Sequence, residues 1–188
     1  MGGCFSTRAV DDPVATENQS AEKSEEYWLT RVQKSGFALQ HAPESIRNNK
    51  SVVLAAVHQD GYALQFASPQ LQADVDVVVM AVQNKGRAIE FAQRDFRNNK
   101  KVAIEAAKQD PSCLKFISPT LLNDRDVVMT ACQNDSTGEA LKWASLELRG
   151  DKQIVIAAIK ANKNNLKWVA DQNLKKDMDV ISLLQPFE

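Results

Sequence analysis

The chain has 188 residues, of which 25% are charged and 44% hydrophobic, and 23 basic against 24 acidic side chains give a formal net charge of −1. This composition is that of a globular protein and excludes a disordered chain, a collagen and a polybasic nucleic-acid wrapper, so no nucleic-acid partner is expected. No run approaches the roughly 20 apolar residues that cross a bilayer. Three cysteines, an odd number, argue against a secreted disulfide framework.

The chain opens Met-Gly-Gly-Cys-Phe-Ser, where two lipidation signals overlap. Gly2 followed by Ser6 fits the N-myristoylation pattern, and Cys4 lies beside that acceptor, where a tethered thiol is open to palmitoylation. A single myristoyl chain binds bilayers with a constant of only about 10⁴ M⁻¹, so stable anchoring needs a second signal. No basic cluster follows, and Cys4 is therefore the available second signal. The sequence predicts dual acylation of Gly2 and Cys4.

The same segment predicts where the protein resides. Met1 is not followed by the apolar run of a secretory signal peptide, so we expect the cytosolic face of a membrane, with the protein lipid-anchored and peripheral. Residues 7–23 are polar, acidic and aperiodic, which is typical of a flexible spacer. We therefore divide the chain into an acylated flexible segment, 1–23, and an α-helical repeat domain, 24–188.

One short unit recurs through the rest of the chain. Apolar anchors followed by a polar residue fall at positions 39, 64, 89, 114, 141 and 166, at intervals of 25 residues with one interval of 27. The two extra residues lie in the loop around Asp135 to Gly138. A fixed period of this length is the sign of a repeat array.

Each unit predicts two helices. The first begins after a residue whose side chain caps a helix N-terminus, in the series Ser24, Asn49, Asp74, Asn99, Asp124, Asp151 and Asp177. Apolar residues follow at i, i+1, i+4 and i+5, as in Val52, Val53, Ala56 and Val57, and form one helical face. Glycines at 36, 61, 86 and 138 are expected to end this helix in the left-handed conformation. A shorter helix carries the anchors and ends before prolines such as Pro43, Pro69 and Pro119.

A single unit cannot be stable alone, because its six or so buried aliphatic side chains contribute roughly 10–18 kcal/mol against an ordering cost of about 40 kcal/mol. Stacked neighbours share their apolar faces and build one continuous core. We predict an all-α helical-repeat solenoid of about six helix-turn-helix units of 25 residues with terminal half units. The half unit with Tyr27, Trp28, Leu29 and Val32 covers one end, and Val180, Ile181, Leu183 and Leu184 cover the other.

The repeat pattern resembles a known family. The stretch Ala63-Leu64-Gln65-Phe66-Ala67-Ser68, followed by Leu71, Asp74, Val77, Val78, Ala81, Val82 and Gly86, is similar to the helical repeats of the domain of unknown function 4116. The resemblance covers roughly residues 36–184, and the last unit departs from it with Lys163 at the glycine position and Asn165 at an alanine position. It implies a helical-repeat fold and assigns no chemistry.

The repeat positions explain the residues that elsewhere suggest catalysis. Cys113 and Cys132 occupy small apolar core positions, where cysteine acts as a hydrophobe. His41 shares the position of Phe66, Phe91, Phe116, Trp143 and Trp168 and is expected to join an aromatic ladder, while His58 shares a solvated position. No metal-ligand spacing or phosphate-binding loop occurs. We expect no catalytic residues, no metal, no cofactor and no enzyme activity.

Lysines gather in the C-terminal third. Lys115, Lys142 and Lys167 occupy one repeat position, and Lys160 and Lys163 lie in the same part of the sequence. They are either a solvated face or a surface for an acidic partner or anionic lipid. We predict a membrane-tethered adaptor or scaffold that binds an unknown protein or peptide through its repeat surface. A small-molecule or lipid carrier with a pocket between units, and a structural assembly subunit, stay open as alternatives.

Overall fold

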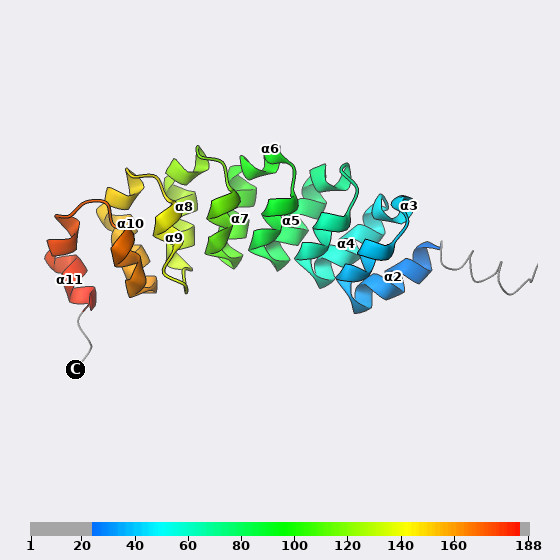
Figure 1. Ribbon diagram of the computed structural model, residues 1–188, viewed down its shortest axis with the longest axis horizontal. Helices are drawn as coiled ribbons and strands as arrows, with labels where there is room; N and C mark the ends of the chain where they lie inside the picture. The colour runs from blue at the N-terminus through cyan, green and yellow to red at the C-terminus, as the bar shows by residue number, and fades with distance from the viewer. Residues whose placement is uncertain (1–23, 185–188) are drawn as a thin grey trace, which may run out of the picture.

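The computed structural model describes residues 24–184, which form an elongated array of stacked helices running from α2 at one end to α11 at the other (Figure 1). None of these described residues forms a strand, and the valine cluster at 77–79 is helical. The predicted all-α helical-repeat fold is therefore confirmed.

The predicted long helices are all present, and they pack side by side in chain order (Figure 1). They are α2 (Glu25–Lys34), α4 (Lys50–Gln59), α5 (Val75–Asn84), α7 (Lys100–Gln109), α8 (Arg125–Gln133), α10 (Lys152–Ala161) and α11 (Met178–Leu184). The cap series is confirmed as well. Asp74 is typical: its Oδ1 accepts hydrogen bonds from the backbone N–H groups of Asp76 and Val77 at 3.0 and 3.2 Å.

The second helix of each unit is a 3₁₀ helix in all but one case, and these short helices form a second layer. They are η1 (Gly36–His41), η2 (Gly61–Phe66), η4 (Gly86–Phe91), η5 (Pro111–Phe116), the α-helical α9 (Ala140–Trp143) and η8 (Lys163–Trp168). The six-residue run of η2 is typical: an extended residue bounds it at each end, Asp60 and Ala67.

A third turn, which the sequence analysis did not predict, links each unit to the next. These turns are α3 (Glu44–Arg47), η3 (Leu71–Ala73), α6 (Arg94–Arg97), η6 (Leu121–Asn123), η7 (Leu148–Gly150) and η9 (Leu174–Lys176). Three or four residues are too few to show a helical period, and the turns therefore left no pattern in the sequence. Counted from Ser24, six units of three turns are complete and α11 is a terminal half unit.

The predicted left-handed glycines are wrong at three of four positions. Among the described residues only Gly138 has a positive φ, of 77°. At Gly36 a Cβ would meet the carbonyl oxygen of Ala56 in the next unit at 2.5 Å, and Gly61 and Gly86 approach Ala81 and Ala106 in the same way. Glycine is therefore needed at these positions because neighbouring units touch there, backbone to backbone.

The core runs the length of the array between the two helical layers. Val52, Val53, Ala56 and Val57 are fully buried, and their counterparts in the following units are buried too. The anchors at 39, 64, 89, 114 and 141 are fully buried, whereas Leu166 is half-buried. The last unit thus departs from the common packing, as its sequence does.

Ion pairs link the N-terminus of one long helix to that of the next. Lys50 lies 2.9 Å from Asp74, and the pairs Lys100–Asp124, Arg125–Asp151 and Lys152–Asp177 repeat this contact. Where the first helical residue is Glu25 or Val75 instead of a basic one, the next cap is asparagine, at 49 and 99. The hydrogen bond from Lys50 holds the pKa of Asp74 below its usual value.

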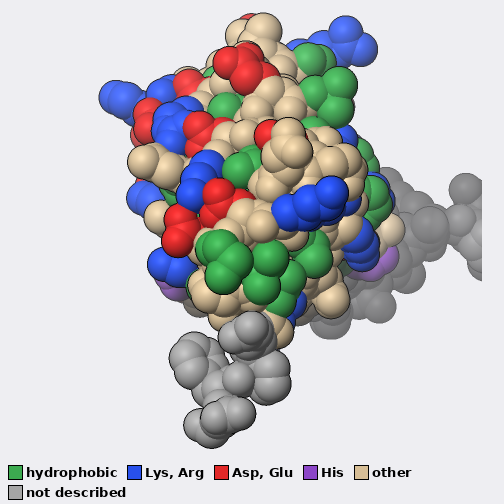
Figure 2. Space-filling model, turned by 90° about the vertical axis from the view of Figure 1, so that its left-hand side faces the viewer, with side chains coloured by type: hydrophobic (Ala, Val, Ile, Leu, Met, Phe, Trp, Pro, Cys, Tyr) green, Lys and Arg blue, Asp and Glu red, His purple; other side chains and the backbone are tan. Residues whose placement is uncertain are grey.

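The C-terminal end of the array exposes positions that are covered elsewhere. Ile181 of α11 is partly exposed, whereas its counterparts Val78 and Val128 are fully buried by the next helix. Figure 2 views this end and shows apolar side chains gathered on its lower part, beside intermingled acidic and basic ones. Met178, at the start of α11, is 76% exposed.

Candidate functional site

The reactive side chains that the sequence offers are placed as core or surface residues. Cys113 and Cys132 are fully buried, and burial raises the pKa of each thiol to about 12. His58 is exposed, as expected for its repeat position. Within residues 24–184 no group of three or more histidine, cysteine, aspartate or glutamate side chains is placed to hold a metal ion.

Aromatic side chains line the outer side of the 3₁₀ layer and contact one another diagonally between units. Phe37 packs edge-on against Phe66 of the next unit at a centroid distance of 5.7 Å, and Tyr62 meets Phe91 at 6.3 Å. The expected place of His41 in this ladder is wrong, because His41 is exposed and the ring contacts between units are Phe37–Phe66 and Tyr62–Phe91. In both contacts the ring at this repeat position, Phe66 or Phe91, is contacted by an aromatic residue of the unit before it. His41 lies in the first described unit, so no preceding unit supplies such a contact.

Three of the five lysines named above lie at equivalent positions in three successive units of this layer, each beside an aromatic ring. The ammonium groups of Lys115 and Lys167 lie 4.5 and 5.0 Å from the ring centroids of Phe116 and Trp168. Lys142 bridges two units, at 5.1 Å from Trp143 and 5.3 Å from Trp168. We call this set, Lys115, Lys142 and Lys167 with Phe116, Trp143 and Trp168, the cationic ridge.

The ridge lysines have no carboxylate partner among the described residues, and all three are exposed. Basic residues at the helix starts, such as Lys100 and Lys152, are by contrast paired within the array. The sequence carries a signal for the ridge, because each of its lysines is followed at once by an aromatic residue. The ridge is thus a row of unpaired cations on an aromatic base.

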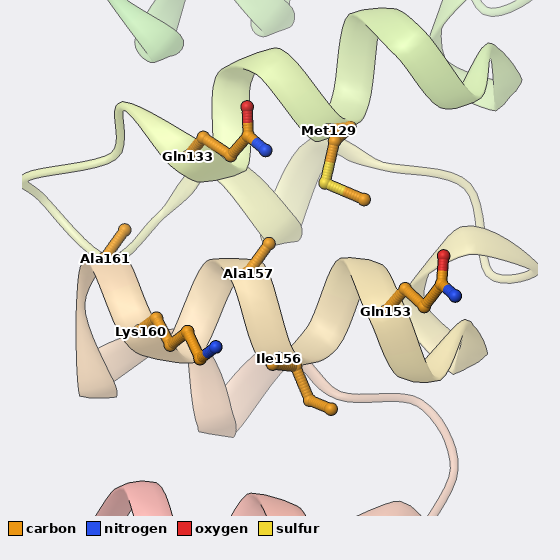
Figure 3. Close-up of a pocket in the computed structure, with 7 residues that line it drawn as sticks. All are labelled: Met129, Gln133, Gln153, Ile156, Ala157, Lys160 and Ala161. Atoms are coloured by element: carbon orange, nitrogen blue, oxygen red, sulfur yellow. The ribbon is translucent and has the colours of Figure 1, made fainter.

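The structure does not bring the other two lysines to the ridge. Lys160 is on α10 and lines a groove of about 490 Å³ between α8 and α10, together with Met129 and Ile156 (Figure 3). The ammonium group of Lys163 donates a hydrogen bond of 3.3 Å to the carbonyl oxygen of Leu184 at the end of α11. Lys160 and Lys163 therefore belong to different parts of the surface.

A buried polar network supports the ridge from below, and the sequence analysis missed it. Asp135 is 1% exposed, and its carboxylate accepts hydrogen bonds from the backbone of Gly138 and Ala140 and from the Asn165 amide, at 2.7–3.0 Å. Burial opposes ionisation, yet these donors lower the pKa of Asp135. Trp168 donates its indole N–H to the Gly138 carbonyl at 3.2 Å. The inserted loop therefore fixes the ring on which Lys142 and Lys167 lie.

The predicted acylation sites, Gly2 and Cys4, lie outside the described residues. Across 24–184, no helix is both long and apolar enough to cross a membrane.

Comparison with known proteins agrees with the repeat architecture. The family described as a domain of unknown function, DUF4116, matches in five overlapping segments, 24–72, 49–97, 74–122, 99–149 and 124–175. Each segment spans two neighbouring units, and together they cover most of the chain. No curated protein and no solved structure matches the chain. With its units stacked as this family's repeats predict, the chain belongs to the DUF4116 family.

Proposed function

We propose that the chain is a non-catalytic adaptor, tethered to the cytosolic face of a membrane, whose helical-repeat surface binds an acidic segment of a protein partner. The observation that carries the proposal is the cationic ridge. Its three lysines are exposed and lack carboxylate partners, although acidic side chains outnumber basic ones in the chain. Unpaired cations in a row favour association with a partner of opposite charge.

The form of the ridge supports a peptide partner. Packed helices lie about 8–10 Å apart, so the lysines of neighbouring units repeat at about the span of three extended residues. The aromatic rings beside them supply apolar contact area at low cost in side-chain entropy. An acidic segment with apolar side chains between its carboxylates matches both features.

The tether rests on the N-terminal residues. Gly2 and Cys4 form a paired acylation signal, and two acyl chains provide stable anchoring where one does not. Replacing Gly2 with alanine in the native cell is expected to move the protein to the soluble fraction. Retention of the Gly2→Ala variant on membranes, or intact-mass spectra without acyl groups on the native protein, would refute the tether.

The binding surface is tested by charge reversal in the full chain. The ridge variant carries Lys115→Glu, Lys142→Glu and Lys167→Glu. When proteins crosslinked to the chain on membranes are quantified, we expect the ridge variant to lose partners that the wild type retains. The matched control reverses three exposed lysines that also lack ion pairs, Lys34, Lys101 and Lys176. A purified partner should then bind the wild type and the control equally and bind the ridge variant at least tenfold more weakly. Equal binding to all three proteins would refute the proposal.

One observation favours a second function, that of a small-molecule or lipid carrier. The groove between α8 and α10 is lined by the apolar side chains of Met129, Ile156 and Ala157 and by polar ones that include Gln153 and Lys160 (Figure 3). A lipid extracted together with the native protein, and lost in an Ala157→Trp variant that fills the groove, would favour the carrier. An ordered polymer in the membrane extract would favour an assembly subunit instead.

A further inference from the structure

A polar groove crosses the edge of the array where the long helices end and the 3₁₀ helices begin. It has a volume of about 500 Å³ and is lined mainly from three successive units, with Asn84, Gln109 and Asn134 at equivalent positions and Tyr62 from the unit before them. Asn84 and Gln109 are the last residues of α5 and α7, and Asn134 is the C-cap of α8, on the side opposite the ion-paired helix starts.

In the first units, the side-chain amide at this position accepts a hydrogen bond from a backbone N–H of the preceding unit. The Gly36 N–H donates to the Gln59 side chain at 2.5 Å, and the Gly61 N–H donates to the Asn84 side chain at 2.9 Å. Each amide therefore joins its own unit to the 3₁₀ helix of the unit before it.

This hydrogen bond between units is missing at the two equivalent positions inside the groove. Proline at 111 has no N–H, so the Asn134 side-chain oxygen has nothing to accept at the equivalent place, while its Nδ2 donates to the Thr130 carbonyl at 2.8 Å. One unit earlier, neither the N–H of buried Gly86 nor the side-chain amide of Gln109 has a hydrogen-bond partner among the described residues. The groove thus holds a backbone N–H on buried Gly86 and an exposed Gln109 amide, both without a protein partner. Only the buried N–H carries the cost of a polar group left unpaired, whereas the Gln109 amide is open to a ligand.

The charge of the lining residues and the length of the groove indicate which kind of ligand it binds. Lys85 and Asp110 contribute one charge of each sign, so the lining has no net charge and favours a neutral ligand. Side-chain amides and a backbone N–H are the groups that pair with a peptide main chain. At about 3.3 Å per extended residue and about 9 Å per unit, a segment of roughly six to nine residues crosses the three units.

We infer that this groove binds an extended, uncharged peptide segment of a partner protein through its main chain, at Gly86, Gln109 and Asn134. This surface is separate from the cationic ridge, and the inference does not depend on the proposed function. The groove provides a second contact with a partner: it recognises the main chain of an extended segment, whereas the cationic ridge recognises acidic side chains.

The test uses the full chain and a phage-displayed library of random nine-residue peptides without charged side chains. Enriched peptides are expected to bind the Gln109→Ala and Asn134→Ala variants about five- to tenfold more weakly than the wild type, as loss of one hydrogen bond implies. Gln59→Ala is the matched control, since its amide has the same repeat position but lies outside the groove. Methylation of alternate peptide nitrogens should abolish binding.

Three outcomes would overturn the inference. The first is that no peptide is enriched on the wild type over the double variant Gln109→Ala, Asn134→Ala. The second is that the enriched peptides lose binding in the ridge variant and keep it in the groove variants. The third is an amide-exchange measurement in which the Gly86 N–H of the free protein is protected by the Gln109 side chain.

Discussion

The glycines between units give the sharpest test of how the array is held together. At Gly36 a Cβ would lie 2.5 Å from the Ala56 carbonyl oxygen, whereas an ordinary C–H···O contact is about 3.3–3.6 Å. Gly36→Ala therefore forces two units apart by roughly 1 Å. Overpacking of this kind costs about 1–3 kcal/mol, and weakening of the Gly36–Gln59 hydrogen bond adds about 1 kcal/mol.

The lower entropy of the unfolded alanine chain offsets about 0.4–1 kcal/mol of this cost, which leaves a net loss of about 1–3.5 kcal/mol. Guanidinium unfolding followed by circular dichroism measures the change. Gly150→Ala is the control, because nothing lies within 4 Å of a Cβ at that position, and it should be neutral or slightly stabilising. A third variant, Gly36→Asn, separates two explanations for the glycine: the close contact with the next unit and a left-handed backbone. Asparagine tolerates the left-handed conformation but brings a Cβ into the contact. If Gly36→Asn is milder than Gly36→Ala, the close-contact explanation is wrong.

Three further predictions concern the network, the ion pairs and the thiols. Asp135→Ala leaves buried N–H groups of Gly138 and Ala140 without an acceptor and should cost at least about 3 kcal/mol in unfolding free energy, while Asp135→Asn should cost less. The pKa of Asp74 is lowered on folding by the bond from Lys50, so its contribution to stability is present above the usual value of 3.8 and is lost as pH falls below it. Unfolding of an Asp74→Asn variant should accordingly depend less on pH between about 5 and 3. Cys113 and Cys132, with pKa values raised to about 12, should react with a thiol reagent only on unfolding, and reaction of the native protein would contradict their burial.

The pattern of apolar and capping residues was sufficient for the fold. A cap at Asp74 followed by Val77, Val78 and Ala81 determines where a helix begins and which side is buried, because these are local interactions within a few residues. The same holds for the expected burial of Cys113, which follows from its repeat position.

The candidate sites depend on contacts between neighbouring units. The repeat spacing in the sequence does not show which side chains of two units come into contact. The lysines at 115, 142 and 167 were visible in the sequence, but only the stacking of neighbouring 3₁₀ helices puts Lys142 over Trp168 of the next unit. The same stacking leaves Lys160 on another surface.

The order of residues therefore determined the helical period, the helix starts and the number of units, since each depends on neighbours in the chain. Only the tertiary structure decided why Gly36 is glycine, how the inserted loop buries Asp135, and where the amide of Gln109 is left open. The reason is physical: these features arise where atoms some 25 residues apart come within a few ångströms, and that distance is set by packing between units rather than within them.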